Sequence, residues 1–421
     1  MKRRIRRILS LCLACILLGA CATEDGRVLD PRFDTEEYLP QYDMQNEFSF
    51  VNVACETEDT IYYMMFMAEQ QIHYYNKETG EGGILCGKPE CTHAENGCNS
   101  FAITAGGLNI YDGRIWFITW NPGAPGSILY AMDLDGTKRE RVQTLSYQGG
   151  NGTKMHLHRG YLYIGVSQRE VIEGEPSYHL TITRQEIGNE ADEPELVYEN
   201  RARMSQQFRY IIQGNTLYGY CQYAESTDIE KTMELFRCDL TTGTQETLAT
   251  WDSTSTYPGG LWIDEENIYL SESELLGEEE KRETWTTQLW VWQYSLKEGT
   301  IEKRMEINHP RAGGQWEIAP DLHLGAVEQV PQEKKYAFTI LDISGEIVRE
   351  YIVDNNPTGG ELSGQMTYGM TEKGMICSIS WMLEQKEKGD PVSLEEIWWV
   401  PVNPAEEVEK LAEYYTYTLA S

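Results

Sequence analysis

Three cysteines and one histidine lie close together in one short segment of the chain. They are Cys86, Cys91, His93 and Cys98, and their spacing is C-x4-C-x-H-x4-C. Three thiolates and one imidazole would make a closed tetrahedral zinc site, which is structural because no position is left for a catalytic water. A local disulfide with one spare thiol, or three solvent-facing thiols, are the alternatives, because a protein outside the cytoplasm can meet an oxidant. We therefore predict that this Cys/His segment binds zinc or a similar metal, with the disulfide as the second interpretation.

A fourth cysteine, Cys21, follows an N-terminal segment that is typical of an export signal. Five basic residues among the first seven precede an apolar stretch, residues 8–18, that is too short to span a bilayer. The segment ends Leu18-Gly19-Ala20-Cys21, which resembles the lipobox of bacterial lipoproteins. This resemblance implies that lipid is attached to the Cys21 thiol and that the chain is cleaved before it. An ordinary signal peptide with an incidental cysteine is the alternative.

These features predict three parts of the chain and the location of the protein. Residues 1–20 would be a lipoprotein signal peptide, residues 21–45 the lipidated cysteine with a polar flexible tether, and residues 46–421 a folded domain. The alternative is that residues 21–45 dock on the folded domain and cap it instead of forming a tether. Acyl chains on Cys21 would hold the protein at the extracytoplasmic face of the cell membrane.

The charge of the chain excludes some partners. The net charge is −32, from 67 acidic and 35 basic residues. A field of this sign repels nucleic acid and anionic lipid head groups, so we expect no nucleic-acid partner and a membrane anchor that is covalent. We also expect the protein to be a monomer.

The elements that would position these residues follow from a repeat in the sequence. An Ile or Leu followed by another residue, large in most cases, recurs at intervals of 47 to 55 residues, and a turn residue recurs between these pairs. Glycine at a tight turn accepts the positive φ that a hairpin demands. Both positions occur seven times, which predicts seven similar units. The pairs are Ile61-Tyr62, Ile115-Trp116, Leu162-Tyr163, Leu217-Tyr218, Ile268-Tyr269, Leu322-His323 and Ile376-Cys377, and the turns are Gly80, Gly136, Gly188, Gly243, Gly299, Gly345 and Asn403-Pro404.

Units of this kind must stack on one another. Ile268 and Tyr269 would point to opposite sides of their strand, so both faces of the unit are apolar. A closed ring of stacked units buries every face and leaves only short edges. The sequence therefore predicts an all-β fold, a seven-bladed β-propeller of four-stranded antiparallel blades over residues 46–421.

The remaining cysteines are interpreted from their places in the repeat. Besides Cys21 and the Cys/His segment, the predicted mature chain has Cys55, Cys221, Cys238 and Cys377. We expect Cys377, which stands in the large-residue position, to be a buried apolar side chain. Cys221 and Cys238 fall on consecutive strands of the fourth blade, where they could face each other as a disulfide or as two reduced thiols.

The lipobox, the acidic chain, the Tyr-rich blades and the Cys/His segment together resemble β-propeller lipoproteins of anaerobic Gram-positive bacteria. The blades look similar to those of low-density-lipoprotein-receptor-type and TolB-like propellers. The resemblance covers nearly the whole chain, and it implies the fold and the membrane location. It brings no residue with a known activity to transfer.

Blade topology predicts where a ligand would bind. In each blade, the connection after the second strand and the connection to the next blade emerge on one face, which we call the long-loop face. The other turns, such as Asp112-Gly113, emerge on the opposite, short-turn face. The longest predicted loops are residues 168–177, 224–232, 272–288 and 383–393, and the Cys/His segment, as a blade-to-blade connection, would share their face. Because scaffolds carry function on their variable loops, we expect the ligand on the long-loop face.

Two classes of function remain open. The first is a lipid-anchored extracytoplasmic binding or scaffolding module that recognises a protein, peptide or glycan. The second is an extracytoplasmic hydrolase or lyase with its site in the central funnel of the ring, since propellers host both. The sequence offers no recognisable nucleophile, acid pair or cofactor loop, which favours binding, and we assign no catalytic residue. We expect His323 to pack in the core, and His156 and His158 to pack or to lie at the surface rather than to bind a metal or act in acid–base catalysis.

Overall fold

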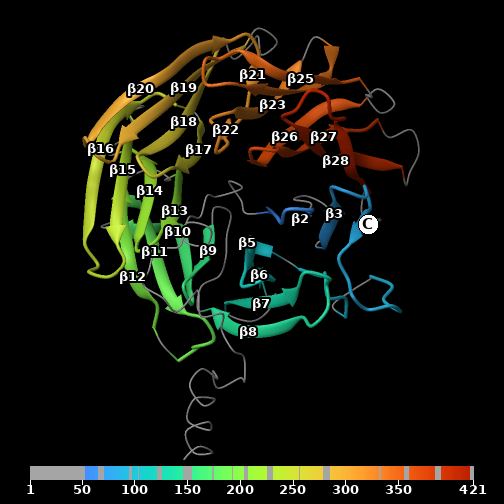
Figure 1. Cartoon of the computed structure of the whole chain (residues 1–421), viewed down its shortest axis with the longest axis horizontal. Coiled ribbons are helices and arrows are strands. Elements are labelled where there is room, and N and C mark those ends of the chain that lie inside the picture. Colours follow the sequence, from blue (N-terminus) through green and yellow to red (C-terminus); the bar gives the residue numbers. More distant parts are fainter. Residues whose placement is uncertain are drawn as a thin grey trace, which may run out of the picture.

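The computed structural model forms a ring of seven antiparallel sheets (Figure 1). The predicted signal segment, Cys21 and the tether lie outside the residues that it describes. Within the described part of the chain, no helical segment has the length and apolarity needed to cross a bilayer. The structure describes residues 53–64, 71–93, 97–102, 104–120, 126–145, 154–172, 175–191, 193–202, 207–224, 231–255, 257–277, 285–330, 333–354, 360–384 and 390–417.

Each sheet is one blade, made of consecutive strands, so the predicted fold class and the number of blades are confirmed. The first four blades are β1 (Ala54–Glu56), β2 (Thr60–Met64), β3 (Ile72–Asn76) and β4 (Gly82–Ile84); β5 (Thr104–Tyr111), β6 (Arg114–Trp120), β7 (Ser127–Asp133) and β8 (Glu140–Leu145); β9 (Lys154–His158), β10 (Tyr161–Ile172), β11 (Glu175–Glu186) and β12 (Glu195–Ala202); and β13 (Gln207–Gln213), β14 (Thr216–Tyr223), β15 (Lys231–Asp239) and β16 (Gln245–Ser253).

The last three blades follow the same plan with one interruption. In the sixth blade, the position of the first strand is shared by two short pieces, β21 and β22, which both pair with β23. The strands are β17 (Tyr257–Ile263), β18 (Asn267–Leu276), β19 (Thr286–Ser295) and β20 (Thr300–His309); β21 (Ala312–Gly313), β22 (Glu317–Ile318), β23 (Leu324–Val330), β24 (Lys335–Leu341) and β25 (Ile347–Val353); and β26 (Glu361–Met370), β27 (Gly374–Met382), β28 (Pro391–Pro401) and β29 (Glu409–Tyr417).

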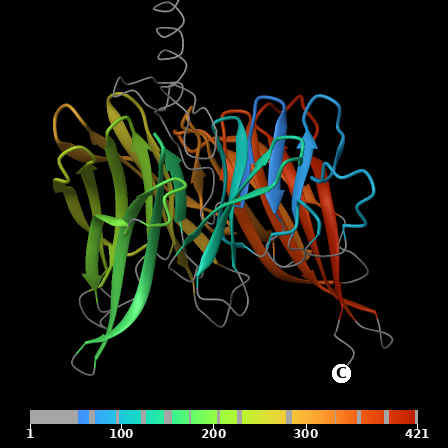
Figure 2. The same ribbon diagram turned by 90° about the horizontal axis from the view of Figure 1, so that it is seen from below.

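The first strand of each blade lies at the centre of the ring and the last strand lies outside. Strands β9, β13 and β17 surround the centre in Figure 1, and β12, β16 and β20 form the outer wall. Seen from the side, the long hairpin of β10 and β11 projects from one face, away from the short turns (Figure 2). Much of the loop predicted at residues 168–177 is therefore strand, because β10 and β11 stay paired as far as Ile172 and Glu175.

The predicted turn position is confirmed in the six blades that carry glycine there. Those glycines all have positive φ, between 66° and 87°, which a side chain would disfavour. In the seventh blade, the N–H of Glu406 donates to the carbonyl of Asn403 at 3.1 Å and closes a turn at the expected place. The six glycines are Gly80, Gly136, Gly188, Gly243, Gly299 and Gly345.

Blades stack through both faces of the second strand, as predicted. Ile268 belongs to the apolar cluster shared with the fourth blade, whereas Tyr269 belongs to the cluster shared with the sixth. In the sixth blade, the predicted pair Leu322-His323 is wrong by two residues. Leu322 and His323 lie in the turn before β23, and fully buried Leu324 takes the core position.

The ring closes by side-chain packing between the seventh and the first blade. Within the described residues, no strand crosses from one terminus into the sheet of the other. One apolar cluster instead joins Tyr63 and its neighbours to Tyr368, Ile376 and Trp399. The Tyr63 hydroxyl also reaches the carbonyl of Leu411 at 3.5 Å.

Two charged side chains brace the inner wall. Arg209 of β13 and Glu317 of β22 are 108 positions apart in the chain, yet their guanidinium and carboxylate form two hydrogen bonds of 2.7 and 2.5 Å. Both residues are almost fully buried. They meet across the fifth blade, where Gly259 and Gly260 let β22 approach so closely that a Cβ on Gly259 would lie 2.2 Å from the Trp316 carbonyl oxygen. The pair therefore ties the fourth blade to the sixth.

The predicted interpretations of the other cysteines have different outcomes. None of the cysteines in the described part of the chain forms a disulfide. Cys377 is fully buried in an apolar cluster, as predicted. Cys221 and Cys238 do not face each other, because the register places Glu234 opposite Cys221 and Leu217 opposite Cys238.

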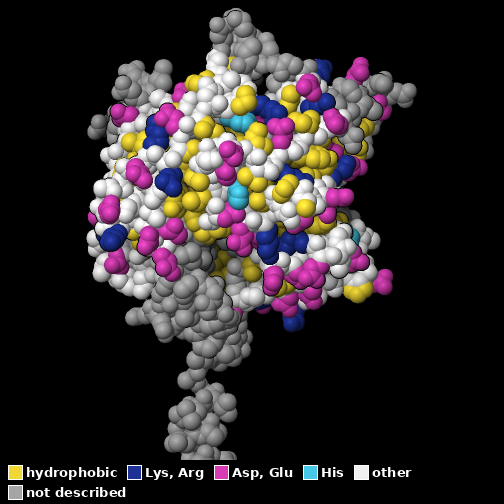
Figure 3. All heavy atoms as spheres, turned by 45° about the horizontal axis from the view of Figure 1, so that its top comes forward, with side chains coloured by type: hydrophobic (Ala, Val, Ile, Leu, Met, Phe, Trp, Pro, Cys, Tyr) yellow, Lys and Arg dark blue, Asp and Glu magenta, His cyan; other side chains and the backbone are white. Residues whose placement is uncertain are grey.

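Acidic side chains are spread over the face shown in Figure 3, interspersed with lysines, arginines and apolar groups. The negative charge is therefore distributed over this face and keeps it solvated, and it is not concentrated in a single binding patch.

Candidate functional site

The four predicted metal ligands lie together beside the outer strand of the first blade. The sulfurs of Cys86, Cys91 and Cys98 and a ring nitrogen of His93 all lie within 4.8 Å of one another. Nδ1 of His93 is 3.4 Å from Sγ of Cys98, and His93 adopts a φ of 57°, which few residues other than glycine do. Ligand atoms on a tetrahedral zinc ion are about 3.8 Å apart. The donor set and its geometry therefore fit a metal such as zinc.

The segment starts where the outer strand of the first blade stops. β4 has only three residues, and the chain then turns toward the second blade. The N–H of Gly87 donates to the carbonyl of Gly136 at 3.0 Å, in the turn between β7 and β8. A Cβ on Gly87 would lie 2.2 Å from Cγ2 of Thr137, so the approach requires glycine.

This contact corrects the predicted face of the segment. Gly136 belongs to a turn between third and fourth strands, and such turns lie on the short-turn face. The N–H of Leu85, directly after β4, donates to the carbonyl of Ile72 at the long-loop end of β3. The Ser100 carbonyl accepts the N–H of Ile72 at the same end. The segment therefore contacts the short-turn end of the second blade as well as the long-loop end of the first, instead of lying on the long-loop face alone.

Arg139 fastens the end of the segment to the second blade. Its Nη1 lies 3.2, 3.3 and 2.6 Å from the carbonyl oxygens of Cys98, Asn99 and Phe101. The guanidinium lies over the ring of Tyr130, 4.2 Å from its centroid. The last ligand of the cluster is therefore held by contacts that need no metal.

The thiols of the cluster differ in their electrostatic surroundings. Burial alone would raise the pKa of Cys86, but hydrogen bonds from the backbone at Lys88 and Asn99 bring it below its ordinary value. Burial raises the pKa of Cys98, and Sγ of Cys98 lies 2.9 Å from the hydroxyl of Ser100. The thiolate is the form that binds a metal, so Cys86 is the thiol best prepared for it.

A groove of about 730 Å³ opens on the long-loop face, toward the centre of the ring. Its place follows from topology, because the innermost strands β13 and β26 begin at this face with Gln207 and Glu361. Four consecutive blades, from the fourth to the seventh, contribute to it. The lining residues are Gln207, Leu275, Trp285, Gly313, Gly314, Gln315, Val327, Gln329, Lys334 and residues 361–367.

The lining is largely apolar and nearly neutral, with a few polar groups. Among the described lining residues, only Lys334 and Glu361 carry a charge, and their charged atoms are 3.4 Å apart. Amides supply most of the remaining polarity, from Gln207, Gln315, Gln329 and Gln365.

Hydrogen bonds hold two of these amides against the groove wall. Nε2 of Gln329 donates to Oε1 of Gln365 at 2.7 Å. Nε2 of Gln315 donates to the carbonyl of Pro258 at 3.1 Å. Side chains oriented in this way are prepared for a ligand before it arrives.

The backbone beside the amides is also fixed. The hydroxyl oxygen of Tyr336 lies 2.7 Å from the carbonyls of Gly364 and Ser380 and accepts the N–H of Gly364 at 3.1 Å. The pairing of β26 with β27 skips a residue between Leu362 and Gly364, which makes Ser363 the extra residue of a β-bulge. Bulges often occur next to functional sites, where they redirect side chains.

Trp285 is half-buried and lines the groove beside Leu275. Its indole packs on Gly277, where a Cβ would lie 2.2 Å from Cδ1. Gly277 also has a φ of 151°. The backbone at Gly277 therefore sets the position of the only aromatic ring among the described lining residues.

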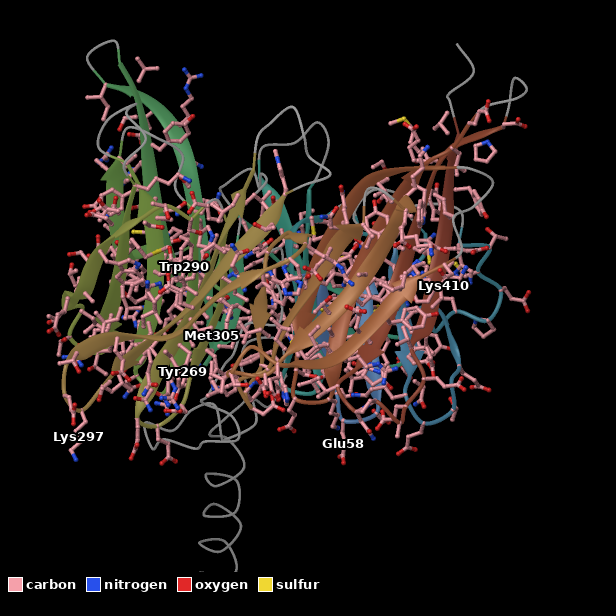
Figure 4. All side chains as sticks on the ribbon, turned by 90° about the horizontal axis from the view of Figure 1, so that it is seen from above. Glu58, Tyr269, Trp290, Lys297, Met305 and Lys410 are labelled. Carbon is pink, nitrogen blue, oxygen red and sulfur yellow. The ribbon has the colours of Figure 1, made fainter. Side chains whose placement is uncertain are left out.

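A second groove, of about 770 Å³, lies on the short-turn face at the seam between the seventh and the first blade. Figure 4 shows Glu58, one of the residues that line this groove, at the short-turn face. Lys297 lies at the same face. The lining of the groove is strongly acidic and includes Glu58, Glu78, Glu372, Glu406, Glu407 and Glu409. The two faces thus offer grooves of similar size and different charge.

Two of the three predicted histidines pack as expected. The ring of His156 makes an edge contact with Tyr210 at 4.7 Å, and Nε2 of His158 lies 2.7 Å from the carbonyl of Gly214. His323 was predicted to pack in the core, and this is wrong. It lies in a turn with 22% of its side chain exposed and pairs with Asp321.

Comparisons with known proteins give a similarity of fold. No protein-family model matches the chain, and no curated protein matches it. Acylaminoacyl peptidase from Pyrococcus horikoshii is 11% identical with a TM-score of 0.47, over 88% of this chain and 54% of that one. Prolyl oligopeptidase B from Galerina marginata is 10% identical with a TM-score of 0.47, over 88% and 52%. The chain thus spans about half the length of these two peptidases.

A third structure is similar over nearly its full length. The β-propeller domain of the Trilobed protease from Pyrococcus furiosus is 13% identical with a TM-score of 0.44, over 90% of this chain and 99% of that domain. The chain itself is a seven-bladed β-propeller with a Cys3His cluster on its outer edge.

Proposed function

We propose that the protein is a lipid-anchored extracytoplasmic binding module whose ligand occupies the groove on the long-loop face. The observation that carries the proposal is the groove itself, with oriented amides, a fixed indole and a bulged strand gathered from four blades. Sites that bind small ligands are concave and place a few polar groups on a largely apolar lining. The near-neutral lining supports binding rather than acid–base chemistry, which would need titratable groups at the reacting atoms.

The anchor in this proposal is a lipid on Cys21. It is supported by the lipobox-like sequence Leu18-Gly19-Ala20-Cys21. A covalent anchor suits a chain whose net charge of −32 would keep it away from anionic lipids. The ring would then present its ligand groove outside the cytoplasm.

The proposal includes a structural metal, with zinc as the best match, in the Cys3His cluster. Cys86, Cys91, His93 and Cys98 would hold it and would leave no position for a substrate. The metal would fix the blade-to-blade connection and take no part in ligand binding.

A groove-filling variant tests the binding function. A Cβ on Gly314 would meet nothing closer than the 4.0 Å contact with Nε2 of Gln365, so Gly314→Trp can fill the groove without displacing the backbone. Gly83→Trp is the matched control, because a Cβ there meets only a 3.9 Å contact on the outer strand of the first blade. Retention of cell-envelope material by the purified protein should be lost in Gly314→Trp and kept in Gly83→Trp. Equal retention by both variants would overturn the proposal.

A further inference from the structure

We propose that the ligand of the groove is an uncharged oligosaccharide with a sugar ring stacked on Trp285. This inference rests on the proposed binding function and names its ligand class. The charge, the amides, the indole and the bulged strand carry the argument.

The charge of the groove excludes ionic ligands. Lys334 and Glu361 lie 3.4 Å apart and balance each other, and the other described lining residues are neutral. A phosphate, a nucleotide or an acidic sugar would have to lose water without gaining a cation. A field from a net charge of −32 would also repel it.

The amides match hydroxyl groups. A glutamine presents a carbonyl acceptor beside an NH₂ donor, and each sugar hydroxyl both donates and accepts. The bond between Gln329 and Gln365 uses Nε2 of the first and Oε1 of the second. The pair therefore still offers one donor, Nε2 of Gln365, next to one acceptor, Oε1 of Gln329. Two adjacent hydroxyls of a pyranose present the complementary arrangement.

The indole offers a surface on which a sugar ring can stack, and the glycines leave room for it. The C–H face of a pyranose is apolar and packs on an aromatic ring, and the indole of Trp285 lies directly against Gly277. Gly314 and Gly364 also line the groove without side chains, which lets a bulky ring approach the backbone.

The bulge at Ser363 argues against a peptide. A peptide that adds to a sheet needs a continuous row of backbone groups along the edge strand. β26 is the innermost strand of its blade, and its register is broken between Leu362 and Gly364, within the groove. An added strand would lose its pairing at this point.

The test compares ligand classes on the full chain. The purified protein is applied to an array of neutral and acidic glycans and to an array of unmodified decapeptides, and affinities of the hits are measured by calorimetry. Trp285→Ala and Gln365→Leu remove the stack and the amide. Trp290→Ala and Gln293→Leu are matched controls on β19, because Trp290 donates to Glu306 and Gln293 to Asn267, outside the groove.

We expect binding to neutral glycans that weakens by about tenfold or more in Trp285→Ala and Gln365→Leu and changes less than about twofold in the controls. Unchanged melting temperatures would show that the variants fold. Peptide binding that depends on Trp285 would overturn the oligosaccharide and leave the binding groove in place. If all four variants bind the glycan as well as the wild type does, the groove is not its binding site. If no neutral glycan on the array binds, the proposed ligand class is wrong.

Discussion

Pairing and burial set the electrostatics of several ionisable side chains in the described part of the ring. Arg209 and Glu317 pair with each other across the inner wall. Glu272 accepts from Trp251 and Ser253, and burial still raises the pKa of its carboxyl. Buried charges are costly when they are unpaired, so such groups make the stability of the ring depend on pH.

His156 gives the clearest pH dependence. Burial, followed by the charge of Lys154, lowers its pKa from 6.5 to about 3. The folded state then binds fewer protons than the unfolded state, so the free energy of unfolding should fall as the pH drops from about 6.5 toward 3, by up to about 1.4 kcal/mol per pH unit. Urea unfolding at pH 7, 6 and 5 should show a smaller decline for His156→Gln than for the wild type.

The quantity to compare is the slope of the free energy of unfolding against pH. The absolute free energy is not informative, because the substitution also removes the contact of His156 with Tyr210. Identical slopes for the wild type and His156→Gln would show that this histidine is not buried in its neutral form.

The geometry of the Cys3His cluster predicts the metal content of the purified protein. Protein purified without chelator should contain about one equivalent of zinc, because a structural site of this kind binds tightly. Cys91→Ser and Cys98→Ser should lose the metal, whereas Cys55→Ala, which changes a buried cysteine of β1, should keep it. Metal-free protein in which two of the three thiols resist alkylation until reduced would favour the disulfide instead.

At the scale of elements, the Cys/His segment extends the short outer strand of the first blade, β4, toward the second blade. β4 stops after three residues, and the segment is then held by the second blade through Gly136 and Arg139. The tight turn at Gly136 therefore serves two purposes, as a hairpin of its own blade and as a support for the neighbouring segment.

Arg139→Gln should loosen this support. It removes a guanidinium that reaches three carbonyls, and one charge-assisted contact of this kind contributes about 1.5–3 kcal/mol. Hydrogen exchange of the amides in residues 97–102 should become faster, measured by mass spectrometry. Arg141→Gln, two residues further along in β8, is the control, because Arg141 makes a surface pair with Glu190. Equal exchange in both variants would mean that Arg139 does not hold the segment.

The sequence predicted the elements better than the contacts between them. Spacing and turn glycines were enough for seven blades, because each hairpin imposes the same local demand on φ. In the sixth blade, the predicted core position of the second strand is two residues too early. Leu322 and Leu324 are equally apolar, and only burial in the structure distinguishes them. The grouping of Cys86, Cys91, His93 and Cys98 could be predicted because these residues are neighbours in the chain.

The groove could not be predicted, and neither could the inner brace. The glutamines of the groove come from three different blades and have no shared spacing. Arg209 and Glu317 are 108 positions apart, and only the closed ring brings them together. The pairs Gly259-Gly260 and Gly313-Gly314 on inner strands were the available signal, because glycine inside a strand often marks a close approach.

At the scale of the whole molecule, the ring closes at the seam between the seventh and the first blade by apolar packing together with a few hydrogen bonds. Tyr63 and Trp399 lie in the cluster that fills this seam. The ring is a rigid frame for the groove, which draws its lining from the fourth to the seventh blade and lies away from the seam.

The location of the molecule remains a prediction from its first residues. Cys21→Ser should move the protein from the membrane fraction to the soluble fraction and remove the mass of the acyl chains from the mature N-terminus. Cys55→Ala should stay with the membranes. If Cys21→Ser still sediments with the membranes, the lipid is not the anchor.

The central claim is that the ligand occupies the groove on the long-loop face, and site-specific photo-crosslinking tests it most directly. A benzophenone amino acid replaces Ser363, an exposed residue of that groove, or Glu407, an exposed residue of the acidic groove on the short-turn face. After incubation with cell-envelope material and irradiation, we predict a covalent adduct at position 363 and none at position 407. An adduct at position 407 alone, or at neither position, would contradict the account.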